Sequence, residues 1–184
     1  LSQLEAETIP LKVDSYNIVD VIKACFNNLQ PLAEERSINF VFSAEKDSVY
    51  AMIDKDKLEK IINNLLSNAF KFTPSGGSIY VNINCPDNNA DQITVSVKDT
   101  GIGIPNEFQN KIFDRFYQID NSSKRNFGGS GIGLALVKEL ATLHNWEINL
   151  NSVEGEGTEF VLTIPIKSNH SAVSEKLKAN IEKQ

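Results

Sequence analysis

The segment 54–72 constrains the fold most, because its apolar residues repeat at helical spacing over five turns. Asp54 is a good N-cap residue, and we expect a helix over residues 55–72. On a helical wheel its apolar residues share one arc, which predicts a helix with one face buried in a core. The residues of this arc are Leu58, Ile61, Ile62, Leu65, Leu66 and Ala69.

A second stripe on the same helix is polar. Asn64, Asn68 and Lys71 follow at positions i, i+4 and i+7, so they line up beside the apolar arc. Asparagine is a poor helix former, because its amide competes with the backbone for hydrogen bonds. A carboxamide oxygen suits Mg²⁺, and a lysine suits phosphate. The stripe is therefore a candidate ligand-binding surface, and its alternative is a solvated helix flank.

The remaining patterns alternate between strands and helices. We expect strands over 11–16, 38–42, 49–53, 79–83, 93–97, 146–150 and 159–164, and helices over 18–36, 107–116 and 132–144. The strands fall in antiparallel-looking pairs with substantial helices among them. This order predicts a two-layer α/β sandwich rather than a doubly wound parallel sheet.

Size and charge limit the function. At 184 residues the chain fits one ordinary domain, and its net charge of −6 argues against a non-specific nucleic-acid binder. No apolar stretch approaches the roughly 20 residues of a membrane span, so we expect no direct membrane contact by this segment. Cys25 and Cys85 lie far apart without metal or redox spacing, which is typical of reduced thiols in the cytoplasm.

Two glycine-punctuated segments follow the central helix. Asp99-Thr100-Gly101-Ile102-Gly103-Ile104-Pro105 directly follows an expected strand, where an acceptor-only carboxylate can bind the amine of adenine. Gly128-Gly129-Ser130-Gly131-Ile132-Gly133-Leu134 opens an expected helix, whose free N–H groups favour phosphate. The alternatives are a plain turn for the first segment and a flexible linker for the second.

The long connection between these segments is typical of a functional lid or of disorder. We expect Phe113 and Phe116 to anchor its base to the core. Arg115, Lys124 and Arg125 are candidate phosphate clamps. Ordinary surface cations on a mobile loop are the alternative for these three residues.

Together these segments resemble four sequence boxes of the ATP-binding domain of sensor histidine kinases, members of the Bergerat-fold ATPase/kinase superfamily. The N box is 64–74, the G1 box 99–105, the F box 113–116 and the G2 box 129–134, and 155–160 looks like the final glycine hairpin. The resemblance covers about 11–166. It implies a mixed, mostly antiparallel sheet packed against three helices, with a mobile ATP lid.

By this resemblance Asn68 is the Mg²⁺ ligand, Asn64 supports it, and Lys71 contacts the phosphates. Phe72 borders the adenine of ATP, and Asp99 binds its amine. The implied catalytic residues are Asn64, Lys71 and Arg115. The other implied ATP-binding residues are Gly101, Gly103, Ile104, Lys124, Arg125, Gly129, Ser130, Gly131, Ile132, Gly133, Leu134 and Thr158.

Two departures from the superfamily matter. Relatives that hydrolyse ATP carry a glutamate as general base where this chain has Asn64, so phosphoryl transfer to a side chain fits better than hydrolysis. Neither His144 nor His170 is followed by the acidic residue of a phosphoacceptor site. We therefore expect the acceptor histidine on a dimerisation domain outside this chain, with relay to the aspartate of a response regulator receiver domain.

The expected organisation is a remnant of the dimerisation hairpin over 1–10, the catalytic domain over 11–166, and a polar tail or linker over 167–184. The resemblance implies that this domain lies in the cytoplasm, even if the full-length protein is anchored in the inner membrane. Two other interpretations stay open. One is a nucleotide-binding module that senses without transferring phosphate, and the other is a protein-serine kinase of the same superfamily, such as an anti-sigma factor.

Overall fold

A computed structural model describes residues 10–85, 91–118 and 131–166. Its strands are β1 (Asp14–Asn17), β2 (Asn39–Ala44), β3 (Tyr50–Ile53), β4 (Ser78–Asn84), β5 (Gln92–Asp99), β6 (Glu147–Val153) and β7 (Gly157–Pro165). Its helices are α1 (Ile18–Asn28), α2 (Gln30–Glu35), α3 (Lys55–Phe72), α4 (Asn106–Gln109) and α5 (Gly133–Leu143). Within the described residues no helix is both long and apolar enough to cross a membrane.

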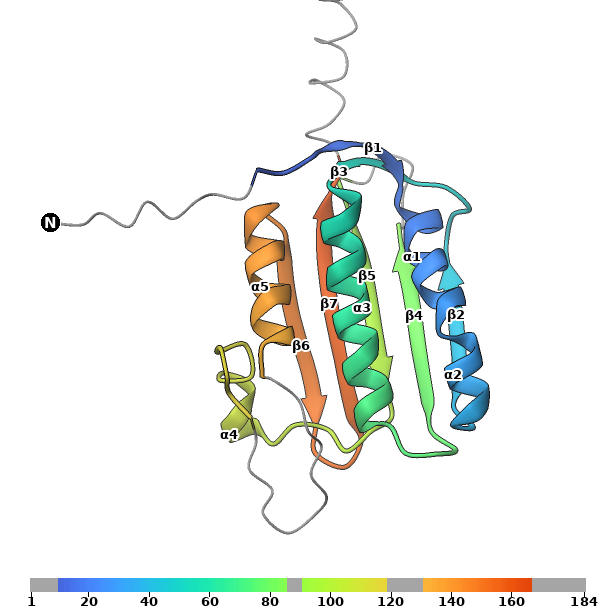
Figure 1. Ribbon diagram of the computed structural model, residues 1–184, viewed down its shortest axis with the longest axis vertical. Coiled ribbons are helices and arrows are strands. Elements are labelled where there is room, and N and C mark those ends of the chain that lie inside the picture. Colours follow the sequence, from blue (N-terminus) through green and yellow to red (C-terminus); the bar gives the residue numbers. More distant parts are fainter. Residues whose placement is uncertain (1–9, 86–90, 119–130, 167–184) are drawn as a thin grey trace, which may run out of the picture.

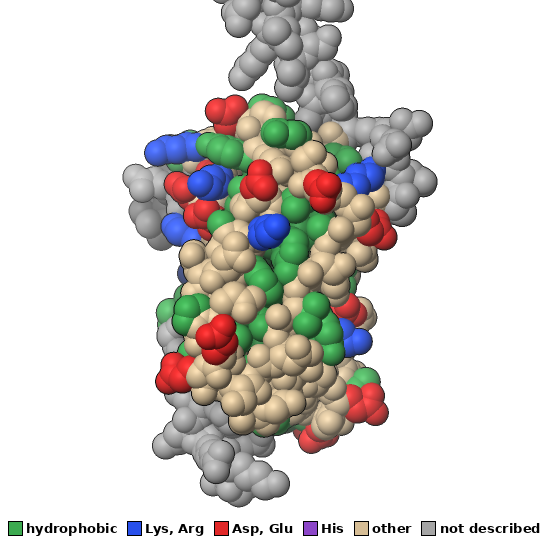
Figure 2. Space-filling view, turned by 90° about the vertical axis from the view of Figure 1, so that its right-hand side faces the viewer, with side chains coloured by type: hydrophobic (Ala, Val, Ile, Leu, Met, Phe, Trp, Pro, Cys, Tyr) green, Lys and Arg blue, Asp and Glu red, His purple; other side chains and the backbone are tan. Residues whose placement is uncertain are grey.

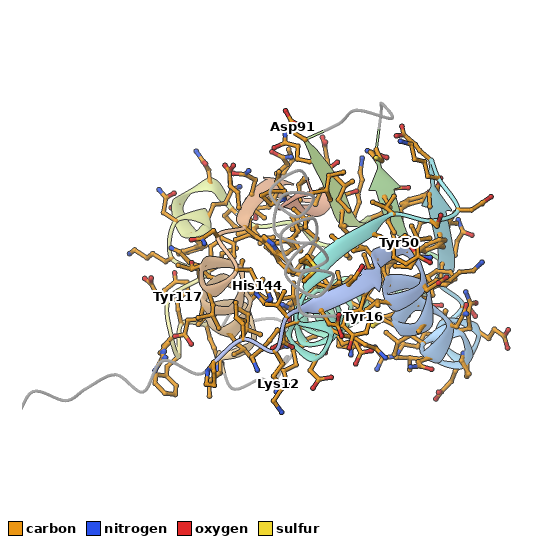
Figure 3. All side chains as sticks on the ribbon, turned by 90° about the horizontal axis from the view of Figure 1, so that it is seen from above. Lys12, Tyr16, Tyr50, Asp91, Tyr117 and His144 are labelled. Carbon is orange, nitrogen blue, oxygen red and sulfur yellow. The ribbon has the colours of Figure 1, made fainter. Side chains whose placement is uncertain are left out.

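The predicted two-layer sandwich is confirmed. A five-stranded sheet has the order β2-β4-β5-β7-β6, and α1, α3 and α5 cover one of its faces (Figure 1). The view from above shows the two layers end-on (Figure 3). Strand β2 runs parallel to β4, while the other neighbours in this sheet are antiparallel. The sheet is therefore mixed and mostly antiparallel, as the resemblance implies.

The core lies between α3 and the sheet. All six residues of the predicted apolar arc are buried, and Phe70 joins them. Strands β4 and β5 bury alternate residues against this face, as the period of a half-buried strand requires: Ile79, Val81, Ile83, Ile93, Val95 and Val97. Seen from the side of α1, α2 and β2, hydrophobic side chains emerge between the two layers, with acidic and basic side chains around them (Figure 2).

Two helix predictions were wrong. The expected helix 18–36 is broken at Leu29 into α1 and α2, because Pro31 lacks an N–H group and is tolerated only in the first turn of a new helix. The expected helix 107–116 is only the four-residue α4. The other predicted element ends differ from the observed ones by at most three residues. Strands β2 and β3 do not pair with each other, since β3 forms a small sheet with β1.

Asp54 joins the start of α3 to the segment that enters the domain. Its Oδ1 accepts a hydrogen bond from the backbone N–H of Lys57 at 3.2 Å, and its Oδ2 accepts one from the backbone N–H of Lys12 at 2.8 Å. Burial alone would raise the pKa of this carboxyl, but these N–H groups and the Lys57 ammonium outweigh burial and lower the pKa. The charge of His144 also lowers the Asp54 pKa.

We predict that Asp54→Ala destabilises the protein by about 1–2 kcal/mol at pH 7, because a helix cap and the Lys12 contact are both lost. A lowered pKa in the folded state means that the charge of Asp54 stabilises the fold above about pH 4. This contribution is lost as the pH falls through the lowered pKa. Urea unfolding at pH 7 and at pH 3 measures both effects. A gap between wild type and variant that does not shrink at pH 3 contradicts the assigned role.

Candidate functional site

Four segments that lie far apart in the sequence meet at one edge of the sandwich. The C-terminal end of α3, the end of β5, the turn between β6 and β7, and the N-terminal end of α5 gather at the lower edge in Figure 1. The sheet register explains part of this, because Asp99 at the end of β5 pairs with Thr158 near the start of β7. The expected site residues on these segments therefore lie at one place.

Asp99 is buried at the end of β5, with only 6% of its surface exposed. Its Oδ1 accepts a hydrogen bond from the Gly101 backbone N–H at 2.8 Å, and the backbone N–H of Thr158 also donates to the carboxylate. Burial raises the pKa of Asp99, although these two hydrogen bonds oppose the rise. The group is a buried acceptor with capacity for a further donor.

The glycines of the segment after Asp99 allow close backbone contacts. A Cβ on Gly101 would lie 2.6 Å from the carbonyl oxygen of Phe72, so this loop rests against the end of α3. Gly103 has a φ of 66°, and a Cβ there would lie 2.0 Å from the carbonyl oxygen of Val153. These two glycines hold the loop between α3 and β6.

The polar stripe of α3 faces the start of α5 at Asn64. The Asn64 Nδ2 donates to the carbonyl oxygen of Lys60 at 2.7 Å, and the Oδ1 lies 2.8 Å from the position of a Cβ on Gly133. Ile132, the N-cap residue of α5, makes no side-chain cap hydrogen bond. The first N–H groups of α5 are therefore not capped by the Ile132 side chain. They lie next to the side-chain amide of Asn64.

The rest of the stripe is half-buried. Asn68 lies one turn after Asn64, and Lys71 lies in the last turn of α3. The Lys71 Nζ is 4.9 Å from the centre of the Phe72 ring, and burial lowers the pKa of Lys71. An amide and an ammonium thus project from one helix flank beside the buried Asp99 segment.

The segment after α4 meets the expectations only in part. The Phe113 ring packs edge-on against Phe160 at 6.1 Å, which confirms its anchoring role. The same expectation for Phe116 was wrong: this side chain is 72% exposed, and its φ of 63° turns the chain away from a helix. The turn is fixed by a hydrogen bond from the Phe116 N–H to the carbonyl oxygen of Gly131 at 2.9 Å.

Arg115 forms an exposed ion pair with Glu139 on α5, where its Nε donates at 2.8 Å. Its assignment as a phosphate clamp and catalytic residue stays a prediction, and this role requires the guanidinium to leave Glu139. Of the other predicted ligands, Gly131, Ile132 and Leu134 lie at or just before the start of α5. Four predicted residues lie outside the described part of the chain: Lys124, Arg125, Gly129 and Ser130.

The sequence did not single out two polar residues beside this site, Ser152 and Gln109. The Ser152 hydroxyl lies 2.9 Å from the hydroxyl of Thr158, and Gln109 donates to the carbonyl oxygen of Ser152 at 3.0 Å. A serine in a strand and a glutamine in a short amphipathic helix carry no spacing signal, so only the tertiary contacts identify them.

The described residues include no group of three or more His, Cys, Asp or Glu side chains that could hold a metal ion. The predicted cation ligand, the carboxamide oxygen of Asn68, would act together with ligand oxygens and water. Such a donor set fits Mg²⁺, which often keeps few protein ligands.

The comparisons identify the family. Residues 53–168 match the family described as histidine kinase-, DNA gyrase B-, and HSP90-like ATPase, and the chain belongs to this family. The chain is 40% identical over 176 residues to hybrid signal transduction histidine kinase D of Dictyostelium discoideum. That match covers 92% of this chain but only 11% of the relative, so the chain spans about a tenth of that relative's length.

Two solved structures share the fold. Full-length ShkA in complex with AMPPNP has a TM-score of 0.75 and 26% identity, over 86% of this chain and 32% of that one. Histidine kinase ThkA in complex with response regulator protein TrrA has a TM-score of 0.69 and 21% identity, over 84% of this chain and 42% of that one. The fold is therefore that of histidine kinase catalytic domains.

We predict that Gly103→Ala destabilises the protein much more than Gly155→Ala. Both glycines have a positive φ, so both substitutions carry a cost of about 1–2 kcal/mol for the left-handed backbone. Only Gly103 also faces backbone within 3 Å, whereas nothing lies within 4 Å of a Cβ on Gly155. Urea unfolding of both variants measures the difference. Equal losses would contradict the close contact between the segment after Asp99 and β6.

Proposed function

We propose that this chain is the catalytic domain of a two-component sensor histidine kinase. It binds Mg-ATP and transfers the γ-phosphoryl group to a histidine on a dimerisation domain outside this chain. The observation that carries the proposal is the position of the buried Asp99 carboxylate, at the same edge of the fold as the α3 polar stripe and the start of α5. This arrangement suits a ligand with an amine at one end and phosphates at the other.

Asp99 binds the base. Its carboxylate is a buried acceptor, and the exocyclic amine of adenine supplies a further donor. The Gly101 and Thr158 backbone N–H groups orient the carboxylate. Phe72 borders the base from the end of α3, and Ile104 follows in the loop.

Asn64, Asn68 and Lys71 serve the phosphates, together with the start of α5. The first N–H groups of α5, which the Ile132 side chain does not cap, attract anionic oxygens, and Lys71 adds a positive charge on the facing helix. When bound, Mg²⁺ neutralises phosphate charge and holds the phosphates in one geometry, with Asn68 as its protein ligand. Arg115, Lys124, Arg125, Gly129 and Ser130 belong to the proposed phosphate-binding set.

The side-chain amide of Asn64 favours phosphoryl transfer to a side chain over hydrolysis. Its amide donates to the carbonyl oxygen of Lys60 in its own helix, and an amide cannot take a proton from water at neutral pH. Phosphoryl transfer depends mostly on positioning and charge neutralisation, so the domain itself needs no general base. The nucleophile is then the imidazole of the acceptor histidine.

The proposed partners follow from the proposed transfer of the phosphoryl group to a histidine outside this domain. Residues 11–166 form the proposed catalytic domain, whereas the expected hairpin remnant over 1–10 (all but Pro10) and the expected tail or linker over 167–184 lie outside the described residues. A response regulator receiver domain takes the phosphoryl group from the histidine. Histidine kinase ThkA, whose fold this chain shares, forms a complex with response regulator protein TrrA.

Mixing the chain with a purified dimerisation hairpin of a homologous histidine kinase and γ-labelled Mg-ATP tests the function. We expect acid-labile label on the hairpin histidine. Asn68→Ala should slow labelling by at least about tenfold, as expected for loss of a metal contact. Asn63→Ala is the matched control, because Asn63 is exposed on the same helix outside the stripe. Binding of ATP without any labelling would favour a module that only senses nucleotide.

A further inference from the structure

A chain of hydrogen bonds leads away from the base side of the site through Ser152. The Ser152 Oγ lies 2.9 Å from the Thr158 Oγ1 and 2.9 Å from the carbonyl oxygen of Gly157. It also accepts a hydrogen bond from the backbone N–H of Ile104 at 2.9 Å. One hydroxyl therefore joins β7, which carries Thr158 next to Asp99, to the loop that contains the segment after Asp99.

Gln109 continues this chain into α4. Its Nε2 donates to the carbonyl oxygen of Ile104 at 2.8 Å and to that of Ser152 at 3.0 Å. Both hydrogens of the side-chain amide are used, and both acceptors are backbone groups. The position of α4 is thus fixed to Ser152 itself and to Ile104, whose backbone N–H the Ser152 hydroxyl also binds.

The segment 104–118 then reaches the start of α5. Phe113 packs on Phe160 of β7, and the Phe116 N–H donates to the carbonyl oxygen of Gly131 at 2.9 Å. The contact with Gly131 is close, because a Cβ there would lie 2.9 Å from the Phe116 backbone. One continuous segment thus contacts the base side through Ser152 and the phosphate side through Gly131.

We propose that Ser152 and Gln109 are positioning residues that couple the two halves of the nucleotide site. A shift of Asp99 and Thr158 on binding of the adenine is transmitted through these hydrogen bonds to Ser152, Ile104 and Gln109, and through the segment 104–118 to Gly131 and the start of α5. The proposal rests on the proposed function, because it assumes that adenine binds at Asp99. Neither residue touches the nucleotide in this account.

If Ser152 and Gln109 only stabilised the fold, their removal would have a different effect on nucleotide binding. Each side chain bridges backbone groups, so each removal lowers stability in either case. Coupling further requires that a ligand at the base side changes the phosphate side, and that the variants lose this response while base binding remains. A ligand without phosphate separates the two roles.

The experiment titrates the full chain with adenosine and follows backbone amide signals by NMR. Gly101 reports on the base side, whereas Gly131 and Gly133 report on the phosphate side. The variants are Gln109→Met and Ser152→Ala. Gln92→Met is the matched control, because Gln92 is exposed at the opposite end of β5. A thermal unfolding curve checks that each variant is folded.

We expect adenosine to shift all three glycine signals in the wild type and in Gln92→Met. In Gln109→Met and Ser152→Ala the Gly101 shift should remain, and the Gly131 and Gly133 shifts should be lost. The affinity for AMPPNP with Mg²⁺ should fall by about tenfold, since base binding no longer favours binding at the phosphate side. Unchanged Gly131 and Gly133 shifts in the two variants overturn the coupling. No Gly101 shift in the wild type overturns the proposed function instead.

Discussion

The carboxylate of Asp99, held away from water at the end of β5, is the constraint on which the site depends. A buried carboxylate is costly, because it loses the hydration that it has in the unfolded chain. Here backbone N–H groups of Gly101 and Thr158 compensate for part of that loss, and the pKa remains raised. A donor on a ligand can supply the rest, which is why we propose a binding role for this residue.

Most of the surrounding geometry serves to bring backbone close to this carboxylate. The carbonyl oxygen of Asp99 lies 2.0 Å from the position of a Cβ on Gly157, so β5 and β7 approach there only because β7 begins with glycine. Gly101 similarly lets the loop approach the end of α3. The antiparallel register of β5 and β7 then sets Thr158 opposite Asp99. Sheet pairing and glycine packing together build the base side of the site.

The sequence predicted the parts of this architecture that depend on local patterns. The buried arc of α3, its N-cap at Asp54 and the hairpin of β4 and β5 follow from periodicity and turn chemistry, and the structure confirms them. Pro31 carried the signal for the break between α1 and α2, but the apolar period across it suggested one helix. The short α4 was missed because contacts of Phe113 and Phe116 with distant segments override local helical pattern.

The residues of the candidate site were likewise predicted only in part. The stripe on α3, Asp99 and the two glycine segments were predicted, because each carries a spacing or a residue type with a chemical meaning. Ser152 and Gln109 were not, since their roles exist only where β6, β7 and α4 meet. Arg115 was predicted as a phosphate clamp, but its ion pair with Glu139 was not, because the two residues lie on different elements.

Recognition of the adenine amine by Asp99 is the central claim, and an analogue of ATP without that amine tests it most directly. Calorimetric titration of the chain with Mg-ATP and with the Mg complex of purine riboside triphosphate compares the two ligands. We predict that the analogue binds at least about tenfold more weakly, as expected when a buried hydrogen bond to a charged group is lost. Asp99→Asn should remove most of this difference. Equal affinities of the wild type for both nucleotides would contradict the account.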